Sequence, residues 1–198
     1  MRALAASLLL LAGCNGAAED EGASQEGNAV PAPVAGAAEA TPAKSATQHV
    51  DCHAPEETIF SCPMPGGKHL AVCAPPEGPA QYRFGGSTPE LVLTGGQWAN
   101  TAYSGGGEAQ IRFTNGDTGY VVFSRMIRTH FVAGEPNYPA ISDGVLVTRG
   151  GKFAALRLCE GGQAEMPVQY DAADRAFAQA EELFSDETIR ADPDWAKD

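Results

Sequence analysis

The chain has 198 residues, with 25 acidic against 13 basic residues, 43% apolar residues and 8% aromatic residues. This length accommodates one domain of ordinary size with appendages. The formal charge of -12 excludes nucleic acid as a partner, because nucleic-acid binding depends on clustered Lys and Arg that neutralise phosphates. The one long apolar run lies at the N-terminus, which excludes a helical protein that crosses a membrane several times.

Residues 1–13 have the pattern of an export signal. Arg2 supplies a positive charge, residues 3–11 are almost wholly apolar, and small residues follow. The run is too short for a permanent membrane-spanning helix. The sequence Leu11-Ala12-Gly13-Cys14 resembles the lipobox of bacterial lipoproteins. The resemblance implies that a signal peptidase cuts before Cys14 and that this cysteine carries the acyl chains, such as palmitate, of a membrane anchor. The alternative is an ordinary secreted protein.

The residue after Cys14 is informative within that resemblance. Lipoproteins that are retained at an inner membrane commonly have Asp at this position, whereas this chain has Asn15. The resemblance therefore implies an outer-membrane lipoprotein, on the periplasmic face first and on the cell surface second.

Residues 14–48 are predicted to form a disordered acidic spacer. They are rich in Ala, Gly, Glu, Pro and Ser and contain no aromatic residue, so they cannot bury enough apolar surface to offset their ordering entropy. A flexible chain of this length holds a domain about 30 to 35 Å from its anchor on average. A partner-docking motif is the alternative interpretation of this segment.

From residue 58 onward, short runs rich in Val, Ile, Phe and Tyr alternate with Gly and Pro, and no sustained helical period precedes residue 170. Turn residues between neighbouring runs predict four antiparallel hairpins. Their paired strands are residues 58–62 with 69–73, 81–85 with 90–94, 108–114 with 119–125, and 144–149 with 152–159. The fold class is therefore all-β, as a small antiparallel barrel or a sandwich of about eight strands.

The pattern changes to a helical period over residues 171–184, with Asp171 as the expected N-cap. One face would carry Ala173, Ala176, Phe177, Ala180, Leu183 and Phe184. We expect this C-terminal helix to pack on the sheet, so that the folded domain spans residues 49–184. Residues 185–198 are predicted to form an acidic tail.

Four cysteines remain once Cys14 is assigned to lipid, namely Cys52, Cys62, Cys73 and Cys159. An even number after an export signal predicts two disulfides, and four cysteines allow three pairings. We favour Cys62 with Cys73, which would staple the first hairpin if its register is shifted. Cys52 with Cys159 would then fasten the N-terminal arm to the last strand.

A metal site is the competing use of the N-terminal arm. His49, Asp51, Cys52 and His53 are residue types that bind metals. Pro55 opposes a helix that would place both histidines on one face, and Cys52 keeps the number of disulfide cysteines even. We therefore expect no metal and no cofactor.

The sequence contains no hydrolase elbow, phosphate-binding loop or zinc-protease motif. A catalytic triad around His69 or His130 would depend on proximity that the sequence does not give. The glycine-rich stretch at residues 103–107 is expected to be a tight or mobile loop, since no helix follows it. These observations predict a protein that is not an enzyme, with a small hydrolase as the alternative.

Three residues are candidates for binding. Arg83 and Arg112 each stand between two large apolar residues, so each should point away from an apolar face. Aligned on one sheet they would form a cationic patch for a carboxylate or an acidic partner, and Ser104 lies in the glycine-rich stretch. We favour the other interpretation, in which the arginines are scattered, solvated and paired across strands with Glu90, Glu108 and Asp117.

Residues 57–160 resemble a recurrent, uncharacterised type of proteobacterial exported β domain. The shared motifs are Phe60-Ser61-Cys62, Val72-Cys73, Tyr82-Arg83-Phe84-Gly85, Gly105-Gly106-Gly107, Arg112-Phe113-x-Asn115-Gly116, Tyr120-Val121-Val122 and Cys159. Residues 104–109 are also similar to part of the membrane-bound inhibitors of c-type lysozyme, which are small lipoprotein β-barrels. This chain lacks the basic residue that precedes the glycine in those inhibitors.

The sequence thus predicts a lipid-anchored cell-envelope lipoprotein that works as a binding or envelope-maintenance module. Its partners would be the membrane, through the anchor, and a protein or envelope component, through exposed loops at residues 101–108 or 129–138. A lysozyme-inhibitor-like protein is the alternative function.

Overall fold

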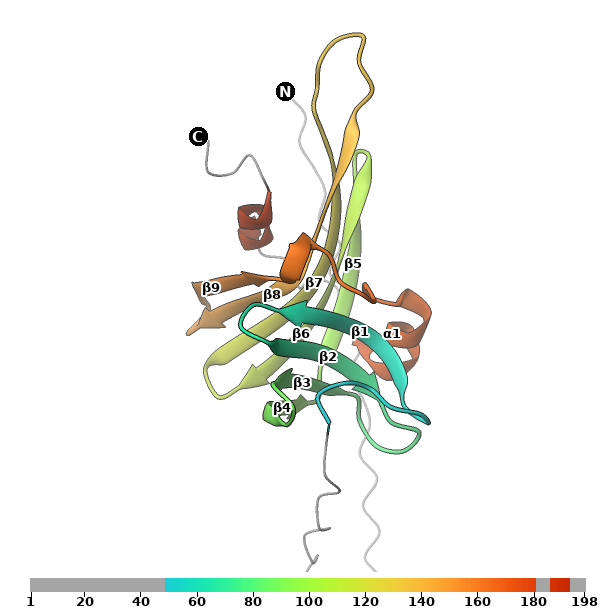
Figure 1. Cartoon of the computed structure of the whole chain (residues 1–198), viewed down its shortest axis with the longest axis vertical. Helices are drawn as coiled ribbons and strands as arrows, with labels where there is room; N and C mark the ends of the chain where they lie inside the picture. Colours follow the sequence, from blue (N-terminus) through green and yellow to red (C-terminus); the bar gives the residue numbers. More distant parts are fainter. Residues whose placement is uncertain (1–48, 181–185, 193–198) are drawn as a thin grey trace, which may run out of the picture. The chain divides into compact units, whose positions relative to one another are not determined.

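The computed structural model describes residues 49–180 and 186–192. Their regular structure is almost entirely β, in two antiparallel sheets and one added parallel pair (Figure 1). Within these residues, no helix has the length and apolar character needed to cross a membrane. The all-β prediction is confirmed in the form of a sandwich-like arrangement of two sheets.

The smaller sheet contains four strands in the order β1-β2-β3-β4. They are β1 (Glu57–Met64), β2 (Lys68–Ala74), β3 (Gln81–Gly85) and β4 (Pro89–Thr94). Both predicted hairpins of this region are confirmed. The turn between β1 and β2 uses Gly66 and Gly67 at φ of 81° and 68°, a region in which L side chains are strained.

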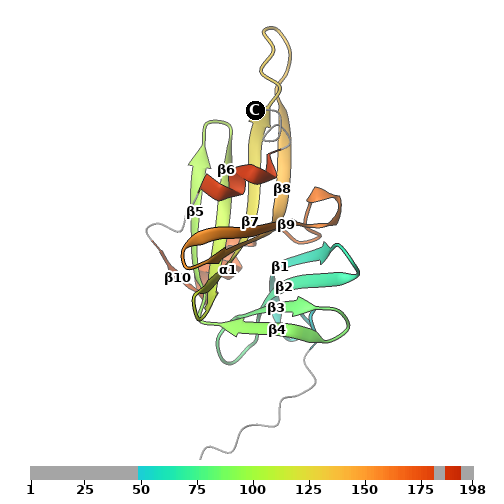
Figure 2. The same cartoon turned by 90° about the vertical axis from the view of Figure 1, so that its left-hand side faces the viewer.

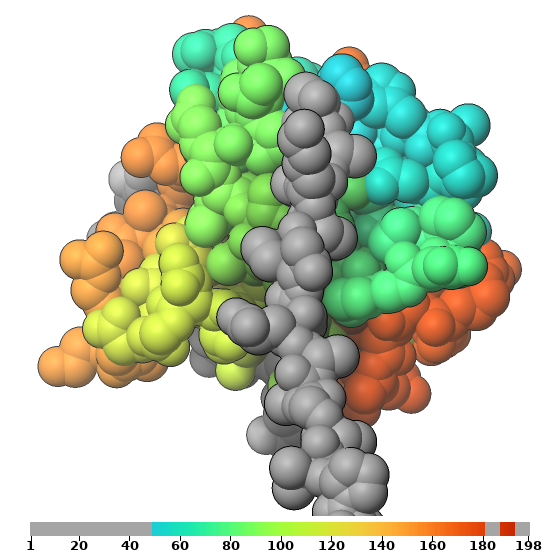
Figure 3. All heavy atoms as spheres, turned by 90° about the horizontal axis from the view of Figure 1, so that it is seen from below, coloured from blue at the N-terminus to red at the C-terminus, as the bar shows by residue number. Residues whose placement is uncertain are grey.

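The larger sheet contains six strands in the order β10-β5-β6-β7-β8-β9. They are β5 (Gln97–Tyr103), β6 (Gly106–Asn115), β7 (Thr118–Thr129), β8 (Tyr138–Arg149), β9 (Lys152–Leu158) and β10 (Ala178–Gln179). The two predicted hairpins of this region are confirmed, and β5 and β10 are additional strands. The turns that end β6 and β8 lie side by side, where the Gly150 amide donates to the Asp117 carbonyl at 2.8 Å (Figure 3).

The core lies between the sheets, because alternate side chains of each strand point to the same face. Tyr82 of β3 packs against Phe113 of β6, with ring centroids 5.5 Å apart, and against Tyr120 of β7 at 5.6 Å. Trp98 of β5 is 1% exposed and belongs to the same cluster. Residues 97–103 contain only two large apolar or aromatic side chains among Ala, Asn and Thr, which explains why the sequence did not reveal β5.

The segment after β9 crosses from the large sheet to the small one. It begins with the 3-10 turn η1 (Glu160–Gly162), and Met166 then pairs with Ser61 of β1 as an isolated bridge. The Gln169 amide donates to the Ile59 carbonyl at 2.9 Å. We call residues 159–169 the crossing segment.

The C-terminal helix is shorter than predicted. Helix α1 spans Tyr170–Ala176, and its N-cap is Gln169, not Asp171. Phe177 is extended and its ring lies edge-on to Phe113 with centroids 5.7 Å apart, after which β10 pairs with β5 (Figure 2). The prediction that the helix continues beyond Ala176 was therefore wrong. Phe177 is buried because its extended backbone packs its ring on the sheet, and not because it lies on a helical face. Leu183 and Phe184 lie outside the described residues.

Part of the predicted acidic tail is structured. Residues 186–191 form the 3-10 helix η2 (Asp186–Ala191), in which Thr188 and Ala191 are buried. The Arg190 guanidinium stands over the Phe153 ring of β9 at 4.2 Å from its centroid. This cation-π contact holds η2 on the face of the large sheet that points away from the core.

The disulfides join Cys52 to Cys73 and Cys62 to Cys159. The presence of two disulfides is confirmed, but the favoured pairing was wrong. Cys62 lies opposite Leu70 in the hairpin register and faces the core, whereas Cys73 lies opposite Thr58 on the other face of the sheet. Cys62 therefore reaches the large sheet, and Cys73 reaches the arm that lies on the outer face.

Removing each disulfide should destabilise the domain to a different degree. The chain-entropy model predicts that a disulfide stabilises the fold more when it closes a longer loop. The stabilisation is about 4.7 kcal/mol for the loop closed by Cys62–Cys159 and about 3.3 kcal/mol for the loop closed by Cys52–Cys73. We expect the Cys62→Ser/Cys159→Ser variant to show the larger fall in the urea-derived free energy of unfolding. The Cys52→Ser/Cys73→Ser variant is the matched control. Equal losses, or a Cys62–Cys73 peptide in non-reducing mapping, would contradict this prediction.

Candidate binding site

The far half of the large sheet extends beyond the cover of the small sheet. Strands β7 and β8 are each 12 residues long, but β9 pairs with β8 only from Gly144 to Arg149. The β7–β8 hairpin therefore projects past the body of the sandwich, beside the β5–β6 hairpin (Figure 1). The small sheet does not cover this half of the large sheet (Figures 1 and 2).

Two cross-strand rows form the floor on the core side of this half, which is buried at Ala109 and Asp143 and exposed at other positions. The strand registers place side by side Ala102, Gly107, Met126 and Ile141 in one row. They place Asn100, Ala109, Ser124 and Asp143 in the next row. Gly107 has no side chain, so the floor is lowered between β5 and β7.

The crossing segment and α1 supply a wall to this floor. Together they enclose a groove of about 510 Å3, whose wall residues are Pro167, Val168 and Tyr170. Met126, Ile141 and Tyr170 are 44%, 45% and 49% exposed, although all three are large apolar or aromatic side chains. We call this cleft the sheet groove.

Asp143 and Ser124 attach the wall to the floor. The Ala164 amide donates to Asp143 Oδ2 at 2.9 Å, and the Val168 amide donates to Ser124 Oγ at 2.9 Å. Asp143 is 1% exposed, and this burial raises the pKa of its carboxyl despite hydrogen bonds from Ser124 and Ala164. The pair therefore fixes the wall that gives the sheet groove its shape.

The tip of the β7–β8 hairpin carries further exposed apolar side chains. Phe131 is 76% exposed, and Val132 and Tyr138 are also exposed. His130 adopts a φ of 61°, and its Nε2 lies 2.7 Å from Glu135 Oε2 across the loop. This contact and the packing of the His130 ring against Tyr138, with centroids 5.6 Å apart, hold the loop in a defined shape.

A buried polar cluster lies on the opposite face of the same strands. The Tyr103 hydroxyl donates to Glu108 Oε2 at 2.5 Å, Gln110 Nε2 donates to Glu108 Oε1, and Arg125 Nε lies 3.6 Å from Glu108 Oε2. Desolvation raises the pKa of Tyr103, and the hydrogen bond to Glu108 raises it further. Sequence reasoning missed this cluster, because it treated Glu108 as a solvated partner of surface arginines. The available signal was that Glu108 and Gln110 alternate with Ala109 and Ile111, which predicts that the two polar side chains share the opposite face of the strand.

The three predicted binding residues do not come together. Arg83 lies on the outer face of the small sheet and is 4% exposed. Its guanidinium donates to Glu56 at 2.9 and 2.5 Å, which lowers the pKa of that carboxyl. Arg112 lies on β6 of the other sheet, and Ser104 lies in the exposed β5–β6 turn. Arg83 thus fastens the N-terminal arm, and the binding roles of all three stay predictions.

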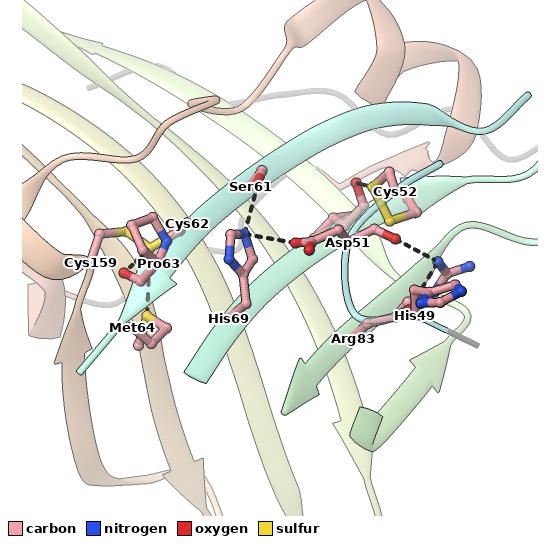
Figure 4. A network of polar contacts seen from close by, with 12 residues as sticks. His49, Asp51, Cys52, Ser61, Cys62, Pro63, Met64, His69, Arg83 and Cys159 are labelled. Atoms are coloured by element: carbon pink, nitrogen blue, oxygen red, sulfur yellow. Dashed lines mark hydrogen bonds and ion pairs between the residues drawn. A yellow bond between two sulfur atoms is a disulfide. The ribbon is translucent and has the colours of Figure 1, made fainter. Parts of the chain in front are cut away.

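His69 stands between Ser61 and Asp51 at the edge of the arm (Figure 4). Ser61 Oγ lies 2.9 Å from His69 Nε2, and Asp51 Oδ1 lies 3.2 Å from the same nitrogen. A catalytic Ser-His-Asp relay needs both ring nitrogens, because one takes the serine proton while the other donates to the carboxylate. Because Ser61 and Asp51 both contact Nε2, their contacts orient the His69 ring and do not form this relay.

The potential metal ligands of the arm are used in other ways. Cys52 is in a disulfide, and the rings of His49 and His53 pack edge-on with centroids 4.7 Å apart. Residues 49–180 and 186–192 contain no group of three or more His, Cys, Asp or Glu placed to hold a metal ion.

Comparison with known proteins adds no relative. No protein-family model, no curated protein and no solved structure matches this chain. The function is therefore inferred from the geometry of the described residues.

Asp143 should make the stability of the domain depend on pH. Its pKa is raised above the ordinary value of 3.8, so the unfolded chain loses the proton first as pH rises. The stability advantage of wild type over Asp143→Asn should therefore be greatest below pH 3.8 and should fall as pH rises to the raised pKa. Urea unfolding across this window measures the difference.

The Asp143→Ala variant provides the matched control for the hydrogen bond. Asn keeps an acceptor for the Ala164 amide, whereas Ala leaves that amide without one, at a cost of about 1 to 3 kcal/mol. A wild-type advantage over Asn that stays constant or rises with pH would contradict the assignment.

Proposed function

We propose that this chain is a lipid-anchored lipoprotein of the cell envelope that acts as a non-catalytic binding module. The observation that carries the binding function is the uncovered half of the large sheet, with its groove and projecting hairpin. The anchor at Cys14 and the outer-membrane location are inferred from the lipobox-like sequence. Two disulfides are consistent with an oxidising, exported compartment.

The composition of the surface favours a protein partner. Met126, Ile141, Tyr170 and Phe131 are exposed, and soluble monomers seldom leave large contiguous apolar patches open. Aromatic residues and Met are enriched in the cores of protein–protein interfaces, whereas the polar pair His130–Glu135 would lie at the rim. We infer that an apolar loop or strand of a partner protein lies in the sheet groove, with the β7–β8 hairpin along its side.

The absence of catalysis in this proposal has a geometric basis. The trio that comes nearest to a nucleophile and base, at His69, shares one ring nitrogen and lies away from the sheet groove. Residues 101–108 and 129–138, which the sequence suggested as binding loops, are the two hairpins that flank the groove. The groove thus supports the binding module over the hydrolase.

The anchor is tested by Cys14→Ala. Without the thiol no thioether to lipid can form, so we expect the variant to leave the membrane fraction of disrupted cells. Asn15→Ala is the control, because it keeps the cysteine and should remain with membranes. Membrane association of a normally processed Cys14→Ala protein would contradict the lipid anchor.

The sheet groove is tested by photo-crosslinking in cells. A crosslinking residue at Ile141 or Phe131 should give the same protein adduct, whereas one at Arg149, exposed at the other end of β8, should give none. Met126→Lys should lower the adduct yield at Ile141 at least tenfold, because it places a charge on the apolar floor, with circular dichroism confirming the fold. Adducts only with a second copy of this chain, or only with lipid, would contradict a separate protein partner.

A further inference from the structure

A second cleft lies at the side of the sandwich where the β1–β2 turn approaches β9 and η1. Its volume is about 560 Å3, within the range of about 300 to 1,000 Å3 that is usual for small-molecule sites. The residues that line it are Met64, Pro65, Lys68, Phe84 and residues 156–161. We call it the edge cleft.

The Cys62–Cys159 disulfide ties the two walls of the edge cleft together. Cys62 is two residues from Met64 on one wall, and Cys159 is itself part of the other wall (Figure 4). The walls are therefore fixed without any ligand. A preformed site of this kind binds more tightly, because less ordering accompanies binding.

The lining of the edge cleft is mainly hydrocarbon. Met64 is 2% exposed and belongs to the core, and Phe84 packs against the same core from β3. Leu156 and Leu158 also line the cleft, but their side chains point to the face of β9 opposite Arg157. An apolar chain laid along Pro65 and Phe84, above Met64, would remove their remaining surface and its own from water.

Two cations line the same cleft. The Arg157 guanidinium makes no hydrogen bond or ion pair within the described part of the chain. Lys68 forms an ion pair with Glu90, and the Glu160 carboxylate also lines the cleft. Arg157 is thus the cation that is available to a ligand, and its planar guanidinium matches a carboxylate in a bidentate hydrogen bond.

We infer that the edge cleft binds a single-chain amphiphile with an anionic headgroup, namely a free acyl carboxylate. The carboxylate lies on Arg157, and the acyl chain lies over Met64, Pro65 and Phe84. The inference does not depend on the proposed function, because the edge cleft and the sheet groove share no residue.

The test uses the full chain carrying Cys14→Ala, so that no covalent acyl group competes for the cleft. Calorimetric titration compares decanoate with decyltrimethylammonium, which has the same chain and the opposite charge, below the concentrations at which micelles form. We expect saturable one-to-one binding of decanoate and at least tenfold weaker binding of the cation. Arg157→Gln should weaken decanoate binding at least tenfold, because it removes the charge-assisted hydrogen bonds.

Arg149→Gln is the control, because it removes an exposed arginine outside the cleft and should leave decanoate binding unchanged. Equal binding of the two amphiphiles, or equal binding by wild type and Arg157→Gln, would overturn the inference. Binding to phosphatidylglycerol vesicles without binding to decanoate would also overturn it, in favour of a bilayer surface.

Discussion

The crossing segment, residues 159–169, is the constraint on which the arrangement of the two sheets depends. It leaves the large sheet at Cys159, whose disulfide to Cys62 spans the sandwich. It then forms the Ser61–Met166 bridge with the small sheet while its amides at Ala164 and Val168 bond to the large sheet. This short, irregular and mostly exposed segment is therefore hydrogen-bonded to both sheets, which ties the sheets to each other.

This constraint also determines where the molecule is open. Residues 159–161 form one wall of the edge cleft, and Pro167 and Val168 form the wall of the sheet groove. The two clefts therefore use opposite ends of the same segment. Burial of the Asp143 carboxylate is unfavourable in itself. The carboxylate accepts a hydrogen bond from the Ala164 amide, however, and so keeps the wall of the sheet groove in place.

The sequence was most informative where structure is local. The turns at Gly66-Gly67 and Gly116-Asp117 set their own hairpins, and the alternation of Arg112 with Ile111 and Phe113 correctly assigned the two faces of β6. Contacts between segments that are distant in the sequence were harder to predict. The partner of Arg83 is Glu56 in an irregular arm, and the disulfide pairing depended on which faces Cys62 and Cys73 occupy.

The sheet groove illustrates the same limit more strongly. Its apolar row needs three registers at once: β5 with β6, β6 with β7, and β7 with β8. Only the middle register follows from a recognisable turn, because β5 was not evident and eight residues, 130–137, separate β7 from β8. A slip of one residue in either outer strand would turn Ala102 or Ile141 to the opposite face. The groove is therefore a property of the assembled sheet, held in register by the long β7–β8 pairing, and no single stretch of sequence encodes it.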